Sequence, residues 1–255
     1  HTWLMLGTRL VALPHAARCH VAVQHRVRTA RLDLITYLRT QMITLLKNAQ
    51  VTFENVTHNL PHYLTQPGVE ALAGKGRGWP AIVIGAGPSR ARHLPRLREV
   101  QDRAILIAVQ TVLKPLLAAG IAPHFVVSLD YHEISQHFFT SVDASRTILV
   151  AEPKVTWHVP DTFPGRMHLL HSAVIDELLP RTAPRRAALR AGSTVAHLAF
   201  YLAEHLGCDP ILLVGLDLAF TDGLYYAPGM PVEAIWNVEL GRFQTIEMKQ
   251  WERIA

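Results

Sequence analysis

The segment Trp79-Pro80-Ala81-Ile82-Val83-Ile84-Gly85-Ala86-Gly87-Pro88-Ser89 decides the fold class of this chain. A β-branched apolar run that is too short for a helix leads directly into two glycines, a proline and a serine. This pattern predicts a buried strand, a tight turn and the start of a helix. Free N–H groups at a helix start favour a phosphate. We therefore expect Gly85, Ala86, Gly87, Pro88 and Ser89 to bind a nucleotide or another phosphorylated ligand, the alternative being a simple strand–helix turn.

The same segment lacks the marks of the two commonest phosphate-binding loops. A dinucleotide fingerprint has a third glycine three positions after Gly87, where this chain has Arg90. A Walker loop ends in Gly-Lys-Ser/Thr, which is absent after the predicted strand. The turn therefore indicates a phosphate site of a different class.

The composition is that of an ordinary globular protein, with 49% hydrophobic and 18% charged residues among 255. The net charge of +5 is spread without a dense Lys/Arg block, so we expect a basic cleft for an anionic substrate and no nucleic-acid partner. Two cysteines, Cys19 and Cys208, suit a reducing cytoplasm. No apolar run reaches the roughly eighteen residues that span a bilayer. Because the chain starts with His1 and stops within a helical pattern at Ala255, we expect it to belong to a longer polypeptide.

From Pro80 onward, short apolar runs alternate with helical patterns. This order predicts an α/β fold with a Rossmann-like, mostly parallel sheet flanked by helices. The expected strands are 81–84, 104–109, 125–129, 147–151, 166–170 and 210–214, and the expected helices are 90–102, 111–119, 131–140, 173–179 and 193–206. We predict a helical N-terminal arm with a glycine-rich linker over 1–78, a nucleotide-binding domain over 79–230 and a C-terminal helix over 231–255.

Polar side chains follow the predicted strands, where parallel sheets bind their ligands. Gln110 and Thr111 follow the second strand, Asp130 the third and Asp217 the sixth. A carboxylate in this position can hold a divalent cation such as Mg²⁺ against a phosphate or serve as a general base. For Asp130 the alternative is a cap for the helix expected at 131–140, and Asp217 could instead fasten the loop that follows it.

Several segments of the chain, in order, resemble a known family. The domain shared by motility-associated-factor (Maf) flagellin glycosyltransferases and archaeal 6-hydroxymethylpterin diphosphokinases is similar over residues 50–225, and the upstream segment resembles the Maf side. The segments are ENVTHNLP at 54–61, GAGPS at 85–89, QTVLKPLLAAGI at 110–121, VSLD at 127–130 and LVGLDLAF at 213–220. The chain departs from the family at Arg90, where leucine is usual, at Leu216, where glutamine is frequent, and at Tyr131-His132, where a proline is more usual.

The resemblance implies a bacterial, nucleotide-dependent transferase that passes a CMP-activated nonulosonic acid, such as pseudaminic or legionaminic acid, to Ser or Thr hydroxyls of flagellin. Bacterial sialyltransferases carry a similar Gly-x-Gly-Pro-Ser turn against CMP, which implies that Gly85, Gly87, Pro88 and Ser89 touch the nucleotide. The alternatives are an ATP-dependent diphosphokinase acting on a hydroxymethyl pterin, and a non-catalytic binding module of a glycan or motility system.

The remaining site residues are assigned on the same basis. The catalytic set is Asp130, His132 and Asp217, with Asp130 or His132 as the base and Asp130 or Asp217 as the ligand of any Mg²⁺. The nucleotide set is completed by Gln110, Thr111, Gly192, Ser193 and Thr194. We expect the helix that begins near Gly192 to be capped by Ser193.

Overall fold

The computed structural model describes residues 21–190, 192, 194–219, 226–227 and 229–230. Contacts divide the chain into two compact units, His1–Thr52 and Phe53–Ala255. The described part of the first unit consists of the helix α3 (Val21–Lys47) and the beginning of α4 (Ala49–His58). The C-terminal helix predicted over 231–255 lies outside the described residues. No described helix combines the length and the apolar character that crossing a membrane requires.

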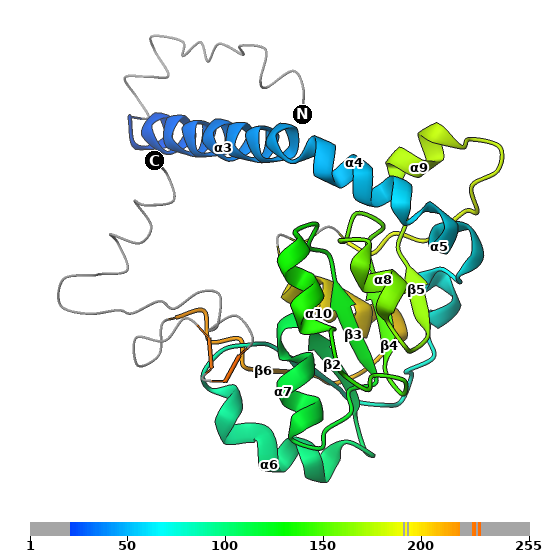
Figure 1. Ribbon diagram of the computed structural model, residues 1–255. Helices are drawn as coiled ribbons and strands as arrows, with labels where there is room; N and C mark the ends of the chain where they lie inside the picture. The colour runs from blue at the N-terminus through cyan, green and yellow to red at the C-terminus, as the bar shows by residue number, and fades with distance from the viewer. Residues whose placement is uncertain (1–20, 191, 193, 220–225, 228, 231–255) are drawn as a thin grey trace. The chain divides into compact units, whose positions relative to one another are not determined.

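The second unit alternates short helices with six strands (Figure 1). Its elements after α4 are α5 (Leu60–Thr65), η1 (Val69–Leu72), β1 (Ala81–Ile84), α6 (Arg90–Val100), β2 (Ile105–Val109), η2 (Gln110–Val112), α7 (Leu113–Ala118), β3 (Phe125–Ser128), η3 (Glu133–Phe138), β4 (Ile148–Ala151), α8 (His158–Thr162), β5 (Met167–Leu169), α9 (Ala173–Leu178), α10 (Val195–Leu206) and β6 (Ile211–Val214).

The six strands form one parallel sheet in the order β5-β4-β3-β2-β1-β6. Ile84 of β1 pairs with Ala108 of β2 on one side and with Val214 of β6 on the other. The predicted α/β fold with a parallel sheet is therefore confirmed. Parallel strands are covered by helices on both faces, which explains why their residues form continuous apolar runs.

Two apolar clusters pack against the sheet, and they divide its two faces at β3 and β4. Val127 and Val150 pack in the cluster that contains Leu198 and Leu202 of α10. Their strand neighbours Val126 and Leu149, together with Ala151, pack in the cluster that contains Val159 of α8 and Ile175 of α9. In Figure 1, α10 passes behind the strands. Successive strand residues thus point to opposite layers, as strand geometry requires.

The segment 74–78, which the sequence suggests as a linker, is hydrogen-bonded to the end of α10. Gly74 N donates to His205 O at 2.9 Å, and Gly76 N donates to Leu206 O at 2.7 Å. Residues 53–78 consequently belong to the same compact unit as the sheet. The predicted boundary at residue 78 thus differs from the division that the contacts define between Thr52 and Phe53.

Two expected helices are altered at their starts. Residues 131–140 form only the short 3₁₀ helix η3, because the backbone at His132 is extended, with ψ at 139°. Before α10 the capping residue is Thr194, whose side chain accepts from His197 N, whereas Ser193 lies outside the described residues. Gly207 ends α10, as the sequence predicts, and adopts the left-handed conformation with φ at 78°.

Candidate functional site

The candidate site lies where the chain order across the sheet reverses. Strands β1 to β5 follow one another outward on one side of β1, whereas β6 returns to its other side. Open α/β sheets bind ligands in the crevice beyond the carboxyl ends of their strands at such a switch point. Here the turn 85–89 after β1 meets residues 215–217 after β6.

Gly85 and Gly87 allow the backbone after β1 to approach the backbone after β6. Gly85 N donates to Val214 O at 2.8 Å, and Gly87 N donates to Gly215 O at 2.8 Å. A Cβ on Gly85 would lie 2.5 Å from the carbonyl oxygen of Gly215, and a Cβ on Gly87 would lie 2.8 Å from it. Both glycines are therefore needed for the contact between the two loops, a role that the sequence assigned to contact with a ligand.

The carboxylate of Asp217 occupies the N-terminus of α6. Ser89 N donates to Asp217 Oδ2 at 3.0 Å, while the Ser89 side chain makes no capping bond. A Cβ on Gly87 would lie 2.2 Å from the same Oδ2. The first N–H groups of a helix lack partners within the helix, and its dipole favours negative charge there. An anionic oxygen thus already sits where the sequence predicts a phosphate.

Arg90 is buried at the start of α6. It stands where a dinucleotide fingerprint has glycine and where the family usually has leucine. Its side chain is 3% exposed, and a Cβ on Gly215 would lie 3.0 Å from its Cβ. Its Nε and Nη1 atoms have no hydrogen-bond partner among the described residues. Burial lowers the pKa of Arg90. This burial could not be predicted from the sequence, because an arginine in the first turn of a helix is usually solvated.

Gln110, Ser128, Asp130 and Ser135 form a hydrogen-bond network at the ends of β2 and β3. Gln110 Nε2 donates to Asp130 Oδ2 and, at 3.2 Å, to Ser135 Oγ, while Ser128 Oγ donates to Gln110 Oε1. Gln110, Ser128 and Ser135 are buried. Gln110 and Asp130, which follow neighbouring strands, thus lie in one network.

Asp130 does not cap a helix, so that alternative is wrong. The helix η3 begins at Glu133, and its capping residue His132 makes no side-chain bond. Burial raises the pKa of the Asp130 carboxyl, although nearby His132, the bond from Gln110 and the charge of Lys154 oppose this effect; Glu152 adds to it. A partly buried carboxyl with a raised pKa is suited to exchange a proton.

The structure does not bring Asp130 and Asp217 together. They follow β3 and β6, between which β2 and β1 lie. Three strand spacings separate the two loops by about 14 Å, too far for the carboxylates to share one ion. Within the described parts of the chain, no group of three His, Cys, Asp or Glu side chains could hold a metal. Any Mg²⁺ would therefore rest on one carboxylate and on the phosphates of a ligand, a common arrangement for this ion.

The other predicted nucleotide residues that the structure describes are Thr111, Gly192 and Thr194. Thr111 lies in η2. Thr194 Oγ1 accepts from His197 N at 3.4 Å and lies 2.9 Å from His197 Nδ1. A Cβ on Gly192 would lie 2.3 Å from the Cβ of His197. Gly192 and Thr194 therefore shape the start of α10, while Ser193 lies outside the described residues.

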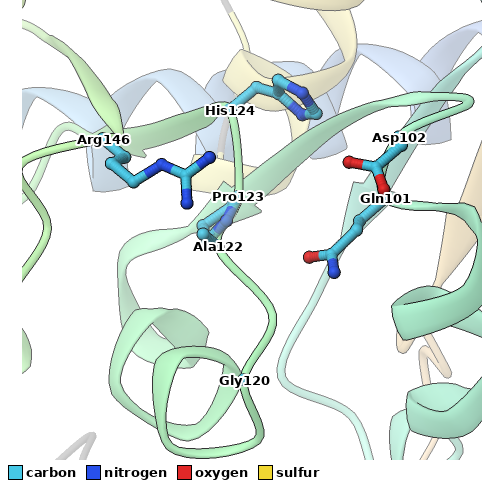
Figure 2. Close-up of a pocket in the computed structure, with 7 residues that line it drawn as sticks. All are labelled: Gln101, Asp102, Gly120, Ala122, Pro123, His124 and Arg146. Carbon is cyan, nitrogen blue, oxygen red and sulfur yellow. The ribbon is translucent and has the colours of Figure 1, made fainter.

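A separate pocket lies at the opposite, amino edge of the sheet (Figure 2). Its volume is about 240 Å³, and it is lined by Gln101, Asp102, Gly120, Ala122, Pro123, His124 and Arg146. His124 Nδ1 accepts a bond from Leu106 N at 3.1 Å, so the imidazole helps to fix the start of β2. Figure 2 shows Arg146 and Asp102 on different sides of this pocket. Because sheets of this kind bind their ligands at the carboxyl edge, we do not place the candidate site here.

Two asparagines near the site were missed as functional residues. Asn55 and Asn59 are buried in the segment ENVTHNLP, and their side-chain amides donate to the loops after β3 and β4. The available signal was their spacing of four residues, which places them on one side of a helix.

The chain is similar to a solved structure, that of the Maf glycosyltransferase from Magnetospirillum magneticum AMB-1. The TM-score is 0.54 at 20% sequence identity, and the match covers 71% of this chain and 31% of that chain. This chain therefore spans about a third of the length of that protein, and the likeness shows a common fold. No curated protein matches the chain.

A family model described as 6-hydroxymethylpterin diphosphokinase MptE-like matches residues 54–223. The matched region contains the turn after β1, the Gln110–Asp130 network, Asp217 and both buried asparagines. This match extends over more than half of the sequence and confirms the predicted resemblance. The chain belongs to the MptE-like family.

Proposed function

We propose that this protein is a nucleotide-dependent transferase of the Maf type, which moves a CMP-activated nonulosonic acid to Ser or Thr hydroxyls of flagellin. The observation that carries the proposal is the anionic oxygen of Asp217 on the N–H of Ser89, at the switch point of the sheet. A site that holds a carboxylate in this geometry can hold a phosphate oxygen instead. Membership of the MptE-like family and the fold shared with a Maf glycosyltransferase support a transferase.

The turn 85–89 would bind the phosphate of the donor. Phosphate and the Asp217 carboxylate compete for the same N–H group, so donor binding requires Asp217 to turn aside or to contact the phosphate through Mg²⁺. Gly85, Ala86, Gly87 and Pro88 shape the backbone around that position. Ser89 would supply both its backbone N–H and its hydroxyl, which makes no capping bond at α6, and Ser89→Ala removes the hydroxyl alone.

Asp130 would act as the general base. The loop after β3 lies two strand spacings, about 10 Å, from the turn after β1, a distance that a nucleotide-linked sugar can span. In the transfer, the acceptor hydroxyl oxygen forms a bond to the anomeric carbon, and the bond from that carbon to the phosphate oxygen breaks. The hydroxyl proton passes to Asp130, and the departing CMP keeps the bonding electron pair. His132, two residues further along this loop, is the alternative base.

A diphosphokinase is the second candidate, because the matching family model carries that description. In this reaction a pterin hydroxymethyl oxygen attacks the β-phosphorus of ATP, pyrophosphate is transferred and AMP leaves. Mg²⁺ bound by Asp217 or Asp130 would neutralise the phosphate charges. A cytoplasmic location, where CMP-sugars and ATP are available, stays a prediction for either activity.

Calorimetric titration with CMP and with ATP, each with and without Mg²⁺, separates the candidates. We expect CMP to bind without Mg²⁺ and to bind more weakly to Ser89→Ala, while Ser172→Ala serves as the matched control. Ser172 also begins a helix, where its hydroxyl accepts from Ile175 N, but that helix is α9. Transfer of label from a CMP-sugar to flagellin then tests the reaction.

The other outcomes select other functions. ATP binding that requires Mg²⁺, followed by AMP release that depends on a hydroxymethyl pterin, would establish the diphosphokinase. Absence of binding by both nucleotides would contradict both enzymes and favour a non-catalytic binding module.

A further inference from the structure

Asn55 ties together two loops that follow neighbouring strands. Its Nδ2 donates to Tyr131 O at 2.9 Å, in the loop after β3, and to Lys154 O at 3.2 Å, in the loop after β4. The side chain is 4% exposed. A side-chain amide group has two donors, and both are used here. Tyr131 directly follows Asp130, so the tie lies next to the proposed base.

Asn59 is equally buried, one helical turn further along, but it serves only one of these loops. Its Nδ2 donates to Pro153 O at 2.9 Å and to Val155 O at 2.8 Å. The two asparagines therefore have the same number of bonds and similar burial. Of these two residues, Asn55 is the one that bridges the loop of Asp130 and the loop of Lys154.

The two bridged loops carry the charges around Asp130. Lys154 Nζ lies 2.6 Å from Glu152 Oε2, and both side chains act on the Asp130 carboxyl. The backbone link between the loops is sparse near this point, where Thr156 N donates to Asp130 O at 3.2 Å. The Asn55 bonds lie beside that link, one to the loop after β3 and one to the loop after β4.

We propose that Asn55 is a positioning residue, which holds the loop of Asp130 in register with the loop of Lys154. Its amide acts on the backbone, so Asp130 keeps its place only while both carbonyls are held. The mechanical part of the proposal, that Asn55 holds the two loops together, follows from the hydrogen bonds alone. The effect on transfer rests on the proposed function.

Hydrogen exchange of the Thr156 N–H tests the mechanical part. Asn55→Ala and Asn59→Ala each remove two bonds to backbone carbonyls, part-buried for Asn55 and buried for Asn59, so the loss of global stability is measured for both variants and exchange is compared after correction for it. At matched global stability, Thr156 is expected to exchange about tenfold faster in Asn55→Ala than in Asn59→Ala. Equal exchange in the two variants, or unchanged exchange in Asn55→Ala, would overturn the proposal. If Asn55→Ala does not fold, Asn55→Ser, which keeps one donor, takes its place in the same comparison.

Kinetics test the consequence for transfer. Asn55→Ala is expected to lower kcat while KM for the CMP-sugar stays close to the wild-type value, because the donor binds at the turn after β1. A rise of KM without a fall of kcat would contradict positioning of Asp130. If the wild type shows no transfer at all, the proposed function fails, whereas the exchange experiment still decides the role of Asn55.

Discussion

Ser89 and Asp217 stand 128 residues apart in the chain and meet in one hydrogen bond, in which the backbone N–H of Ser89 donates to Asp217 Oδ2 at 3.0 Å. The bond joins the first helix of the sheet to its last strand. It also means that the helix start that would receive a phosphate is held by a carboxylate of the protein. Ligand binding and this bond are therefore coupled.

Replacement of Asp217 separates the two roles of its carboxylate. Asp217→Ala removes the acceptor at the start of α6 and is expected to lower the free energy of unfolding by about 1 kcal/mol, as other lost helix caps do. Without Mg²⁺ the same variant should bind CMP more tightly, because the competing anion is gone. Urea denaturation and calorimetry measure the two effects. Asp217→Asn, which keeps an acceptor without the charge, is the matched control, and weaker CMP binding by Asp217→Ala would show that Asp217 contacts the nucleotide.

Gly87→Ala tests the close approach of the two loops. Its Cβ would lie 2.2 Å from Asp217 Oδ2 and 2.8 Å from Gly215 O, so the turn must shift. We expect a loss of about 1–3 kcal/mol in the free energy of unfolding. Gly78→Ala is a useful comparison, because Gly78 has φ at 81° but nothing within 4 Å of the added Cβ. Its cost is conformational alone, so only Gly87→Ala should also impair CMP binding.

The stability of the protein should depend on pH through Asp130. Burial raises the pKa of this carboxyl above its ordinary value of 3.8. The ionised carboxylate consequently destabilises the folded state. This free-energy penalty is absent below pH 3.8, grows as the pH rises toward the pKa of the folded state, and stays constant at higher pH. Asp130→Asn lacks the penalty, so its stability relative to the wild type should increase from acid to neutral pH, while CMP-sugar transfer is lost.

Asp143 serves as a control for Asp130, because its contribution to stability should change with pH in the opposite direction. It is exposed, and hydrogen bonds from Ser145 lower its pKa. Its ionised form therefore favours the folded state, and Asp143→Asn should become less stable relative to the wild type as pH rises. Urea denaturation at a series of pH values compares the two variants. A flat difference for Asp130→Asn would mean that its carboxyl titrates alike in both states.

Cys208 reports on the packing of the segment 74–78. Its thiol is buried, burial raises its pKa, and a Cβ on Gly76 would lie 2.6 Å from its Sγ. In a Cys19→Ser background, we expect the thiol to react slowly with a disulfide reagent until urea unfolds the protein. Rapid reaction of the folded protein would show that the segment 74–78 opens readily from the end of α10.

The strands could be predicted from the sequence because each is a short apolar run; β1 to β5 are largely buried, whereas Leu212 and Leu213 of the edge strand β6 are exposed. Every expected strand agrees with the observed one to within one residue at each end, as β1 at Ala81–Ile84 and β2 at Ile105–Val109 illustrate. The helical pattern over 131–140 was misleading, since the backbone at His132 is extended and only Glu133–Phe138 form a short 3₁₀ helix. Local preference yields to tertiary contacts at such positions.

The positions of the polar residues at the strand ends could be predicted from the sequence, whereas the hydrogen bonds that they make could not. The polar residues after β2, β3 and β6 follow from the rule for parallel sheets. The carboxylate of Asp217 on Ser89 and the amide of Asn55 on Tyr131 join residues 128 and 76 positions apart, and no local pattern specifies such pairs. The burial of Arg90 is likewise a property of the packed turn and of Gly215 beside it.

The strand order has a consequence for how the protein folds during its synthesis. Strand β1 leaves the ribosome long before the edge strand β6, with which it pairs. Until then one edge of β1 is open, and the turn 85–89 has no opposing loop. Pairings between distant segments form late and slowly. A nascent chain halted before Ile211 would thus already contain five of the six strands and still lack β6 and Asp217, so the candidate site is among the last parts of the sheet to be completed.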